Sequence, residues 1–201
     1  DINQQGMDQM MADIASMGGE LFVMDDGWFG DKYPRKNDSS SLGDWVVDKN
    51  KLPNGIEGLL SDAKKHGVKF GIWIEPEMAN TTSELYEKHP DWVLKASERD
   101  VVLGRGGTQV VLDLANPAVQ DFVFGVVDNL MTSYPEIDYI KWDANMSVQN
   151  HGSQYLTKDN QSHMYIEFHR GFEKICQRIR AKYPDLTIQA CASGGGRANY
   201  G

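Results

Sequence analysis

Lys69-Phe70-Gly71-Ile72-Trp73-Ile74-Glu75-Pro76-Glu77 is the stretch that decides the fold. Six mostly apolar residues end abruptly in a charged turn, which is typical of a buried parallel strand that delivers polar groups at its carboxyl end. An amphipathic helix that Gly67 ends precedes this strand, and its apolar positions are Ile56, Leu59, Leu60 and Ala63. The sequence therefore predicts a helix followed by a strand that ends in carboxylates.

The same helix and strand unit recurs along the chain. A helix over roughly residues 4–17 precedes a strand over 21–24. Asn116 as N-cap and Pro117 at the first helical position open a helix that precedes a strand over 139–143. A long helix that ends near Tyr183-Pro184 precedes a strand over 186–191. The pattern predicts four helices and four strands in strict alternation.

One irregular section interrupts this alternation. The β-rich segments 92–94 and 110–112 lie on either side of the turn Gly104-Arg105-Gly106-Gly107. We expect them to form an inserted β-hairpin and not a further strand of the main sheet.

Alternating units of this kind predict an α/β fold with parallel strands and right-handed crossovers, either a (β/α)8 TIM barrel or an open doubly wound sheet. An open sheet gathers its ligands at one switch point, whereas all four predicted strands end in a polar or aromatic cluster, which favours the barrel. A complete barrel takes about 250 residues. We therefore expect residues 1–201 to be a partial catalytic (β/α)8 domain, from about the first helix to the fifth strand, truncated at both ends.

The composition excludes several classes of partner. The chain has 29 acidic and 20 basic residues, and no basic run is longer than Arg35-Lys36, so we expect no nucleic acid partner. No stretch approaches the roughly 20 apolar residues that cross a membrane, so a soluble protein is expected. The five histidines lack metal-ligand spacing, so neither a metal nor a cofactor is predicted, and both cysteines are interpreted as free thiols.

Two groups of charged residues lie at the carboxyl ends of predicted strands. Lys141 and Asp143, with Asn145, project to one side of their strand while Trp142 points the other way. A lysine beside Asp143 would lower the pKa of that carboxyl, as a nucleophile requires, although an ion pair at the strand end is the alternative.

Asp25 and Asp26 form the second group. They could accept several hydrogen bonds from the hydroxyl groups of a ligand, or serve only as an N-cap and a turn. Trp73 offers an apolar face at the same end of its strand, whereas we expect Trp28 to pack in the core.

Five segments of the chain form a series of motifs: Asp25-Asp26-Gly27-Trp28-Phe29-Gly30, Ser41-Leu42-Gly43-Asp44-Trp45, Gly71-Ile72-Trp73-Ile74-Glu75-Pro76-Glu77-Met78, Lys141-Trp142-Asp143-Ala144-Asn145 and Cys191-Ala192-Ser193-Gly194-Gly195-Gly196-Arg197. In their order and spacing they resemble glycoside hydrolase family 36, which contains mainly bacterial α-galactosidases (melibiases). Two departures from the family pattern are Asn37-Asp38, in place of a typical acidic pair, and Ala198-Asn199 after Arg197.

The resemblance implies a role for each matching residue. Asp143 would be the catalytic nucleophile, and Asp25 and Asp26 would bind the O4 and O6 hydroxyls of galactose. The other positions that line the pocket would be Arg105, Lys141, Cys191, Ser193 and Gly194, and Trp73 and Asn145 complete the predicted substrate-binding set.

The resemblance also implies a retaining mechanism, by double displacement through a covalent galactosyl-aspartate, on substrates such as melibiose and raffinose. The acid/base of the family lies in a Ser-Asp-Asn-Thr-Asp segment at the end of the sixth strand, and this chain contains no such segment. We therefore expect the acid/base beyond Gly201 and little activity from residues 1–201 alone.

Other functions stay open. An α-N-acetylgalactosaminidase or a galactosyl-transferring synthase could use the same nucleophile, and the chain could instead be a catalytically incomplete sugar-binding or structural fragment. A glycan at the Asn145 sequon would block the site, which favours a bacterial protein, cytoplasmic or periplasmic. The parent protein could be homo-oligomeric.

Overall fold

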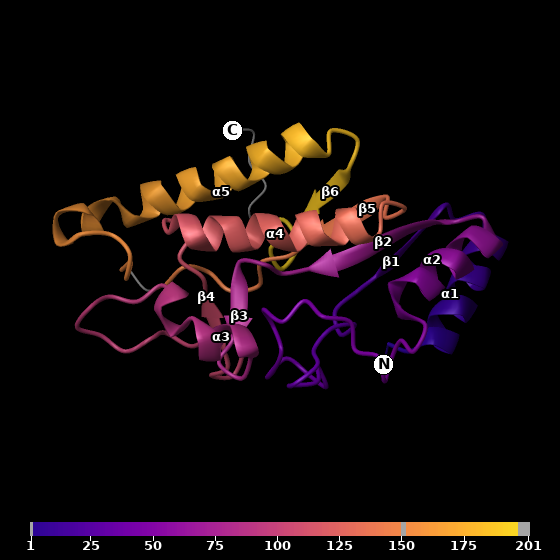
Figure 1. Cartoon of the computed structure of the whole chain (residues 1–201), viewed down its shortest axis with the longest axis horizontal. Helices are drawn as coiled ribbons and strands as arrows, with labels where there is room; N and C mark the ends of the chain where they lie inside the picture. Colours follow the sequence, from indigo (N-terminus) through magenta and orange to yellow (C-terminus); the bar gives the residue numbers. More distant parts are fainter. Residues whose placement is uncertain (1, 150–151, 197–201) are drawn as a thin grey trace.

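Four parallel strands form the main sheet in the order β1-β2-β5-β6 (Figure 1). The strands are β1 (Leu21–Met24), β2 (Lys69–Ile74), β5 (Tyr139–Trp142) and β6 (Thr187–Ala190). This is a computed structural model that describes residues 2–149 and 152–196. The spatial order of the strands follows their order in the chain without reversal, as in a (β/α)8 barrel and unlike an open doubly wound sheet.

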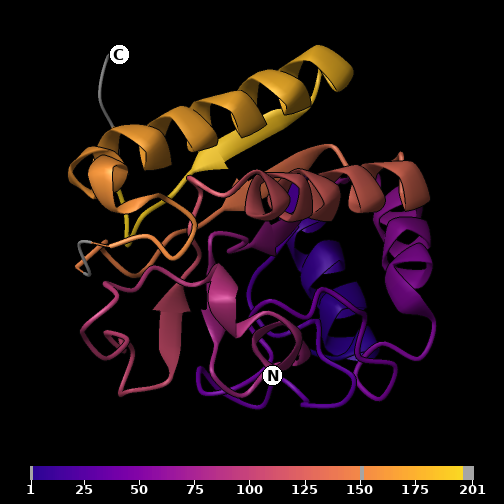
Figure 2. The same cartoon turned by 60° about the vertical axis from the view of Figure 1, so that its left-hand side comes forward.

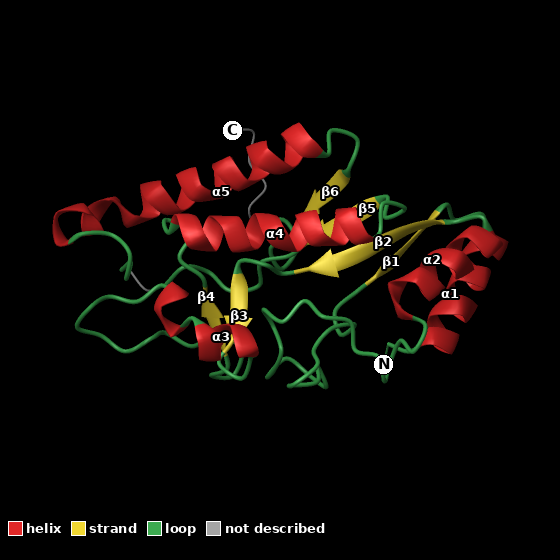
Figure 3. Ribbon diagram, in the orientation of Figure 1, coloured by secondary structure: helices red, strands yellow, loops and turns green. Residues whose placement is uncertain are grey.

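The long helices connect these strands and cover one side of the sheet. They are α1 (Gln4–Ser16), α2 (Gly55–His66), α4 (Pro117–Ser133) and α5 (Met164–Lys182). Helix α1 packs on α2, and α4 packs on α5. Right-handed crossovers between strands that advance in one direction place their helices on the same face, and Figures 2 and 3 show this outer layer.

The helix ends follow the capping signals of the sequence. The side chain of Asn3 accepts a hydrogen bond from the Gly6 amide, and that of Asn116 accepts one from the Ala118 amide. Gly67 ends α2 in the left-handed conformation, with a φ of 72°. The predicted helices and main strands are therefore confirmed to within one or two residues at most ends.

The strict alternation and the hairpin were predicted incorrectly in part. Strand β4 (Gln109–Val111) pairs antiparallel with β3 (Met78–Asn80), and the segment 92–94 contributes only one bridge, between Val93 and Leu112. Short helices also occur: α3 (Glu84–Lys88), η1 (Pro90–Trp92) and η2 (Lys158–His163). A three-residue strand directly after a turn is too short to produce a period-two pattern, so β3 was missed.

The main sheet has two different faces. In β5, Ile140 and Trp142 are buried, and Trp142 packs edge-on against Phe172 of α5, with the ring centroids 5.9 Å apart. Tyr139 and Lys141, on the other face, are only half-buried. The helix side is therefore the apolar core, and the opposite face remains available to polar side chains.

Candidate active site

Strand register brings the candidate residues together in two rows at the carboxyl end of the sheet. Trp73 is paired with Lys141, and Lys141 with Gln189. One step further along the strands, the Asp143 amide donates to the Ile74 carbonyl at 2.8 Å. Because side chains two residues apart share a face, Asp143 lies above the row that contains Trp73 and Lys141.

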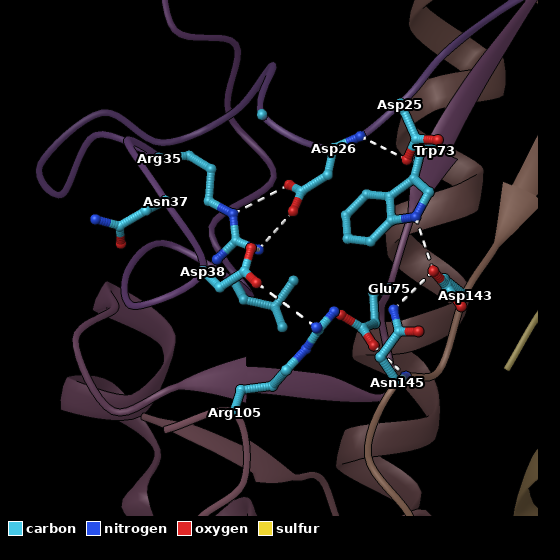
Figure 4. Close-up of polar contacts among 12 residues, drawn as sticks. Asp25, Asp26, Arg35, Asn37, Asp38, Trp73, Glu75, Arg105, Asp143 and Asn145 are labelled. Atoms are coloured by element: carbon cyan, nitrogen blue, oxygen red, sulfur yellow. Dashed lines mark hydrogen bonds and ion pairs between the residues drawn. The ribbon is translucent and has the colours of Figure 1, made fainter. Parts of the chain in front are cut away.

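Asp143 is held by several hydrogen-bond donors (Figure 4). Its Oδ2 accepts from Nδ2 of Asn145 at 2.7 Å and from Nε1 of Trp73 at 3.2 Å, and its Oδ1 accepts from the Ala144 amide at 2.9 Å. Burial would raise the pKa of Asp143, but hydrogen bonds from these groups and from Cys191 together lower it. The carboxylate is thus kept ionised although Asp143 is only 6% exposed.

Lys141 has a different partner from the one expected. Its Nζ donates to Oδ2 of Asp25 at 2.7 Å. Burial would lower the pKa of Lys141, but its contact with Asp25 raises that pKa. The predicted low pKa of Asp143 is therefore confirmed, but its main cause is wrong: neutral donors, and not Lys141, make the hydrogen bonds that lower it.

Asn145 connects the nucleophile candidate to the last strand. Its Oδ1 accepts from the Ser193 hydroxyl at 2.9 Å and from the Ser193 amide at 3.2 Å. Ser193 and the adjacent Gly194 both have positive φ, 49° and 97°, a conformation that turns the chain sharply after β6. Both residues are exposed beside the site. Arg197, the last residue of the same motif, and the Ala198-Asn199 departure lie outside the described residues.

Asp26 is clamped by an arginine that sequence reasoning missed. Nη2 of Arg35 lies 2.6 Å from Oδ2 of Asp26, and Nε of Arg35 lies 3.0 Å from Oδ1. The Arg35 side chain is only 4% exposed and also donates to Oδ1 of Asn80 in β3, at 3.0 Å. A bidentate pair fixes the orientation of the carboxylate as well as its charge. No sequence signal marked Arg35, because it lies in an irregular loop and its partners are nine residues earlier, at Asp26, and 45 residues later, at Asn80.

Arg105 reaches the same side of the site from the turn that precedes β4. Its Nη1 lies 3.6 Å from Oδ2 of Asp38. The other carboxylate oxygen of Asp38, Oδ1, lies 3.6 Å from Nη2 of Arg35. Figure 4 shows the Arg105 side chain directed toward Glu75 and Asn145 while Asn37 points away. The structure therefore places all ten predicted site residues around the carboxyl ends of the strands.

Trp73 does not present the open apolar face that we expected. It is 2% exposed and its ring lies parallel to that of Phe29, with the centroids 6.1 Å apart. The Nε1 of Trp28, a fully buried core residue as predicted, donates to the Trp73 carbonyl at 2.9 Å. Packing from the loop after β1 covers the Trp73 ring, and its observed polar contact is with Asp143.

A second carboxyl group, Glu75, is buried behind Asp143. Glu75 is 1% exposed. Its burial raises its pKa to about 7, despite a hydrogen bond from the Asn145 amide, and the negative charge of Asp143 acts in the same direction. Burial therefore keeps this carboxyl group protonated to a higher pH than that of an ordinary glutamate.

Replacing Glu75 by glutamine should stabilise the protein in a pH-dependent way. Below pH 4.5 both folded and unfolded states bind the Glu75 proton, so the substitution changes little. Between pH 4.5 and about 7 only the folded state binds it, so the stability that the wild-type protein owes to this group falls as pH rises. At pH 8 the free energy of unfolding of the variant should exceed that of the wild-type protein by up to about 3 kcal/mol, and at pH 4 the two should be equal. Thermal melting at both pH values measures the difference as a change in Tm. A difference in Tm that does not depend on pH would contradict the burial argument.

Two further observations bear on the class of site. Within residues 2–149 and 152–196, no cluster of three or more His, Cys, Asp or Glu side chains could hold a metal ion. In the same residues, none of the helices combines the length and apolar character that crossing a membrane requires.

Comparison with known families adds to this geometry. The melibiase family model matches residues 1–201, the full length of the chain. The chain belongs to the melibiase family. The resemblance inferred from the five motifs is thereby confirmed.

Melibiase relatives of known sequence include both fungal and bacterial proteins. Probable alpha-galactosidase C of Aspergillus flavus is 40% identical over 208 residues, which cover 100% of this chain and 26% of that protein. Alpha-galactosidase AgaA of Geobacillus stearothermophilus is 38% identical over 201 residues, which cover 100% of this chain and 27% of that protein. The chain therefore spans about a quarter of their length, and the comparisons do not favour the expected bacterial origin over a fungal one.

Solved melibiase structures share the fold. The α-galactosidase from Lactobacillus brevis superposes with a TM-score of 0.91 at 40% identity, over 98% of this chain and 26% of that one. A variant of AgaA solved in complex with raffinose superposes equally well at 38% identity, over 98% of this chain and 27% of that one. The α/β fold with a parallel, barrel-type sheet is thus confirmed.

Proposed function

We propose that this chain supplies the nucleophile and the galactose-binding wall of a retaining α-galactosidase. The observation that carries the proposal is the environment of Asp143. Four groups hydrogen-bond to its carboxylate and keep its pKa low, and it stands at the carboxyl end of a barrel-type strand, where (β/α)8 enzymes place catalytic groups. AgaA, a relative, has been solved with raffinose and with stachyose, so terminal α-galactosyl residues of such oligosaccharides are the proposed substrate.

In the first step, the ionised Asp143 attacks the anomeric carbon from the face opposite the leaving group. A bond forms between Oδ of Asp143 and C1 while the glycosidic C1–O bond breaks, which gives a covalent galactosyl-aspartate. The donors around Asp143 keep the nucleophile ionised before attack and fix its direction.

The leaving oxygen must receive a proton, and in retaining enzymes the acid lies about 5 to 5.5 Å from the nucleophile. Glu75 is too buried to reach a leaving group. We propose that the family's acid/base aspartate, from a segment this chain does not contain, performs this role. The same aspartate then removes a proton from water, whose oxygen bonds to C1 while the C1–Oδ bond to Asp143 breaks. This step restores the Asp143 carboxylate and releases galactose with its α configuration retained.

Asp25 and Asp26 are the proposed ligands of the galactose hydroxyls. Asp26 is fixed by Arg35 and Asp25 by Lys141, so both carboxylates are oriented before substrate arrives. Cys191, Ser193, Gly194 and Arg105 complete the proposed pocket wall, within a partial catalytic (β/α)8 domain that comprises residues 1–201.

Replacing Asp25 by asparagine tests the sugar contact with little risk to folding, because the Asp25 side chain is 62% exposed. We expect kcat/KM on p-nitrophenyl α-galactoside to fall about 10- to 100-fold, the loss of one hydrogen bond to a charged group. Thermal melting of the variant should match that of the wild-type protein. An unchanged kcat/KM would remove Asp25 from the proposed binding set.

The stereochemistry of the first product tests the proposed mechanism. Proton NMR during hydrolysis of an aryl α-galactoside by the whole protein should show α-galactose first and β-galactose only after mutarotation. β-galactose as the first product would contradict a double displacement, and no hydrolysis would contradict the proposed activity itself.

A further inference from the structure

Glu75 lies at the start of a chain of contacts that ends on the proposed nucleophile. One carboxylate oxygen of Glu75 accepts a hydrogen bond from the backbone amide of Asn145. The side chain of Asn145 donates to Asp143 and accepts from Ser193. Figure 4 shows Glu75, Asn145 and Asp143 arranged in this order.

The other oxygen of Glu75 is held from the opposite direction. Oε2 accepts from Nε2 of Gln109, in β4, at 3.1 Å, and Gln109 is itself only 2% exposed. The β3 and β4 pair therefore fixes Glu75, and Glu75 in turn fixes the backbone just after β5. The β3 and β4 pair is thereby connected to the site through Glu75.

We propose that Glu75 is a positioning residue, which orients Asp143 through Asn145 and touches no substrate. The inference rests on the proposed function, since it assigns a role in the geometry of the same nucleophile. With a 1% exposed fraction, Glu75 contacts no solvent-filled space in which a sugar could bind. Its effect on the geometry of Asp143 passes through Asn145, whose backbone amide donates to Glu75 and whose side chain donates to Asp143.

The charges around Glu75 make its effect dependent on pH. Asp143 and Asp26 oppose its ionisation, whereas Arg105 favours it. When Glu75 ionises, it accepts a stronger hydrogen bond from Asn145 and places a second negative charge beside Asp143. The reactivity of Asp143 should therefore change across the pH range in which Glu75 titrates.

Glu75→Met and Glu75→Gln form a matched pair for the test. Both keep the length of the side chain, but methionine is only a weak acceptor whereas glutamine retains a carbonyl oxygen for the Asn145 amide. In the whole protein, we expect Glu75→Met to lower kcat on p-nitrophenyl α-galactoside about 10- to 100-fold with KM within about threefold of wild type, because a displaced nucleophile loses attack geometry. Glu75→Gln should restore kcat to within about threefold.

Glu77→Met is the control for simple loss of a buried carboxyl group. Glu77 is equally buried in the same turn, but it accepts from Nε1 of Trp142, which points toward the helix side of the sheet. We expect Glu77→Met to lower Tm without lowering kcat by more than about threefold. A loss of kcat equal to that of Glu75→Met, or a failure of Glu75→Gln to restore kcat, would overturn the proposed role of Glu75.

A second measurement serves even if Glu75→Met does not fold. The rate at which 5-fluoro-α-galactosyl fluoride labels Asp143 needs no general acid, because fluoride leaves unaided. We expect this labelling rate to change near pH 7 in the wild-type protein, and we expect no such change in the Glu75→Gln variant. Identical pH profiles would overturn the inference, whereas absence of labelling in the wild-type protein would instead contradict the proposed function.

Discussion

Replacing Asp143 by asparagine in the whole protein is expected to lower kcat on p-nitrophenyl α-galactoside on the order of 10⁴-fold or more. An amide cannot form the galactosyl ester, so the first displacement is lost. Asparagine has nearly the shape of aspartate, and its carbonyl oxygen can still accept from Trp73 or Asn145, which now donate to Oδ2. Substrate binding and Tm should therefore change little, and initial rates with thermal melting measure both effects.

Asp143→Gly is the matched variant that separates loss of the nucleophile from a disturbed site. Its smaller side chain leaves space for azide, which can form the C1–N bond while an activated leaving group such as p-nitrophenolate departs with the electrons of the C1–O bond. We expect added azide to restore turnover and to give β-galactosyl azide. Turnover in Asp143→Asn close to that of wild type, or α-galactosyl azide from Asp143→Gly, would contradict the assigned role.

After the Asp143 substitutions, replacing Arg35 by alanine should have the largest effect, and it should lower both stability and activity. Arg35 is buried and binds Asp26 through two hydrogen bonds, Asn80 through a third and the Ser40 carbonyl through a fourth. Removal of Arg35 leaves the buried Asn80 carbonyl oxygen without this donor, whereas the partly exposed Asp26 carboxylate can be hydrated. The loss is about 1 to 3 kcal/mol, so Tm should fall by several degrees. With Asp26 no longer oriented, kcat/KM on α-galactosides should fall about 100-fold, as measured below the new Tm.

Lys36→Ala is the control, because Lys36 is exposed and adjacent in the same loop. It removes the same charge and should leave both Tm and kcat/KM within experimental error of wild type. Arg35→Lys should be intermediate, since a lysine cannot form the bidentate pair with Asp26. If Arg35→Ala and Lys36→Ala had the same Tm and the same kcat/KM, the contact between Arg35 and Asp26 would contribute to neither stability nor activity.

The sequence predicted the parts of this fold that depend on local patterns. Asn116-Pro117 and Gly67 mark helix ends through capping geometry, which neighbouring residues decide. Strands such as 69–74 are continuous apolar runs with polar ends, and their parallel order follows from the crossover rule. Because the register of parallel strands aligns their carboxyl ends, the clustering of Asp25, Lys141 and Asp143 could also be predicted.

Contacts between distant segments could not be predicted in this way. Lys141 lies two residues from Asp143 in sequence, yet it pairs with Asp25, 116 residues away, which follows β1 at the same end of the sheet. Arg35 and Asn80 meet through a loop and a three-residue strand that leave no periodic signal. The indole ring of Trp73 could stack on a sugar ring, but the rings of Phe29 and Trp45 pack against it and bury it.

Glu75 illustrates the same limit for electrostatics. Its place after β2 was evident from sequence, but its raised pKa depends on burial beneath the β3 and β4 pair, where Gln109 contacts it. Glu75 stands in one of the five family motifs, but the strand β3 was itself missed, so the burial of Glu75 could not be predicted. Its assignment as a positioning residue could come only from the three-dimensional contacts with Asn145.

The covalent step at Asp143 is the central claim, and trapping tests it most directly. The protein is incubated with 5-fluoro-α-galactosyl fluoride, and its intact mass and peptide map are recorded, because the activated fluoride leaves without a general acid and the fluorine slows hydrolysis of the adduct. We predict one fluorogalactosyl group, attached to Asp143. An adduct on a different carboxylate, or none in folded protein that hydrolyses α-galactosides, would contradict the account.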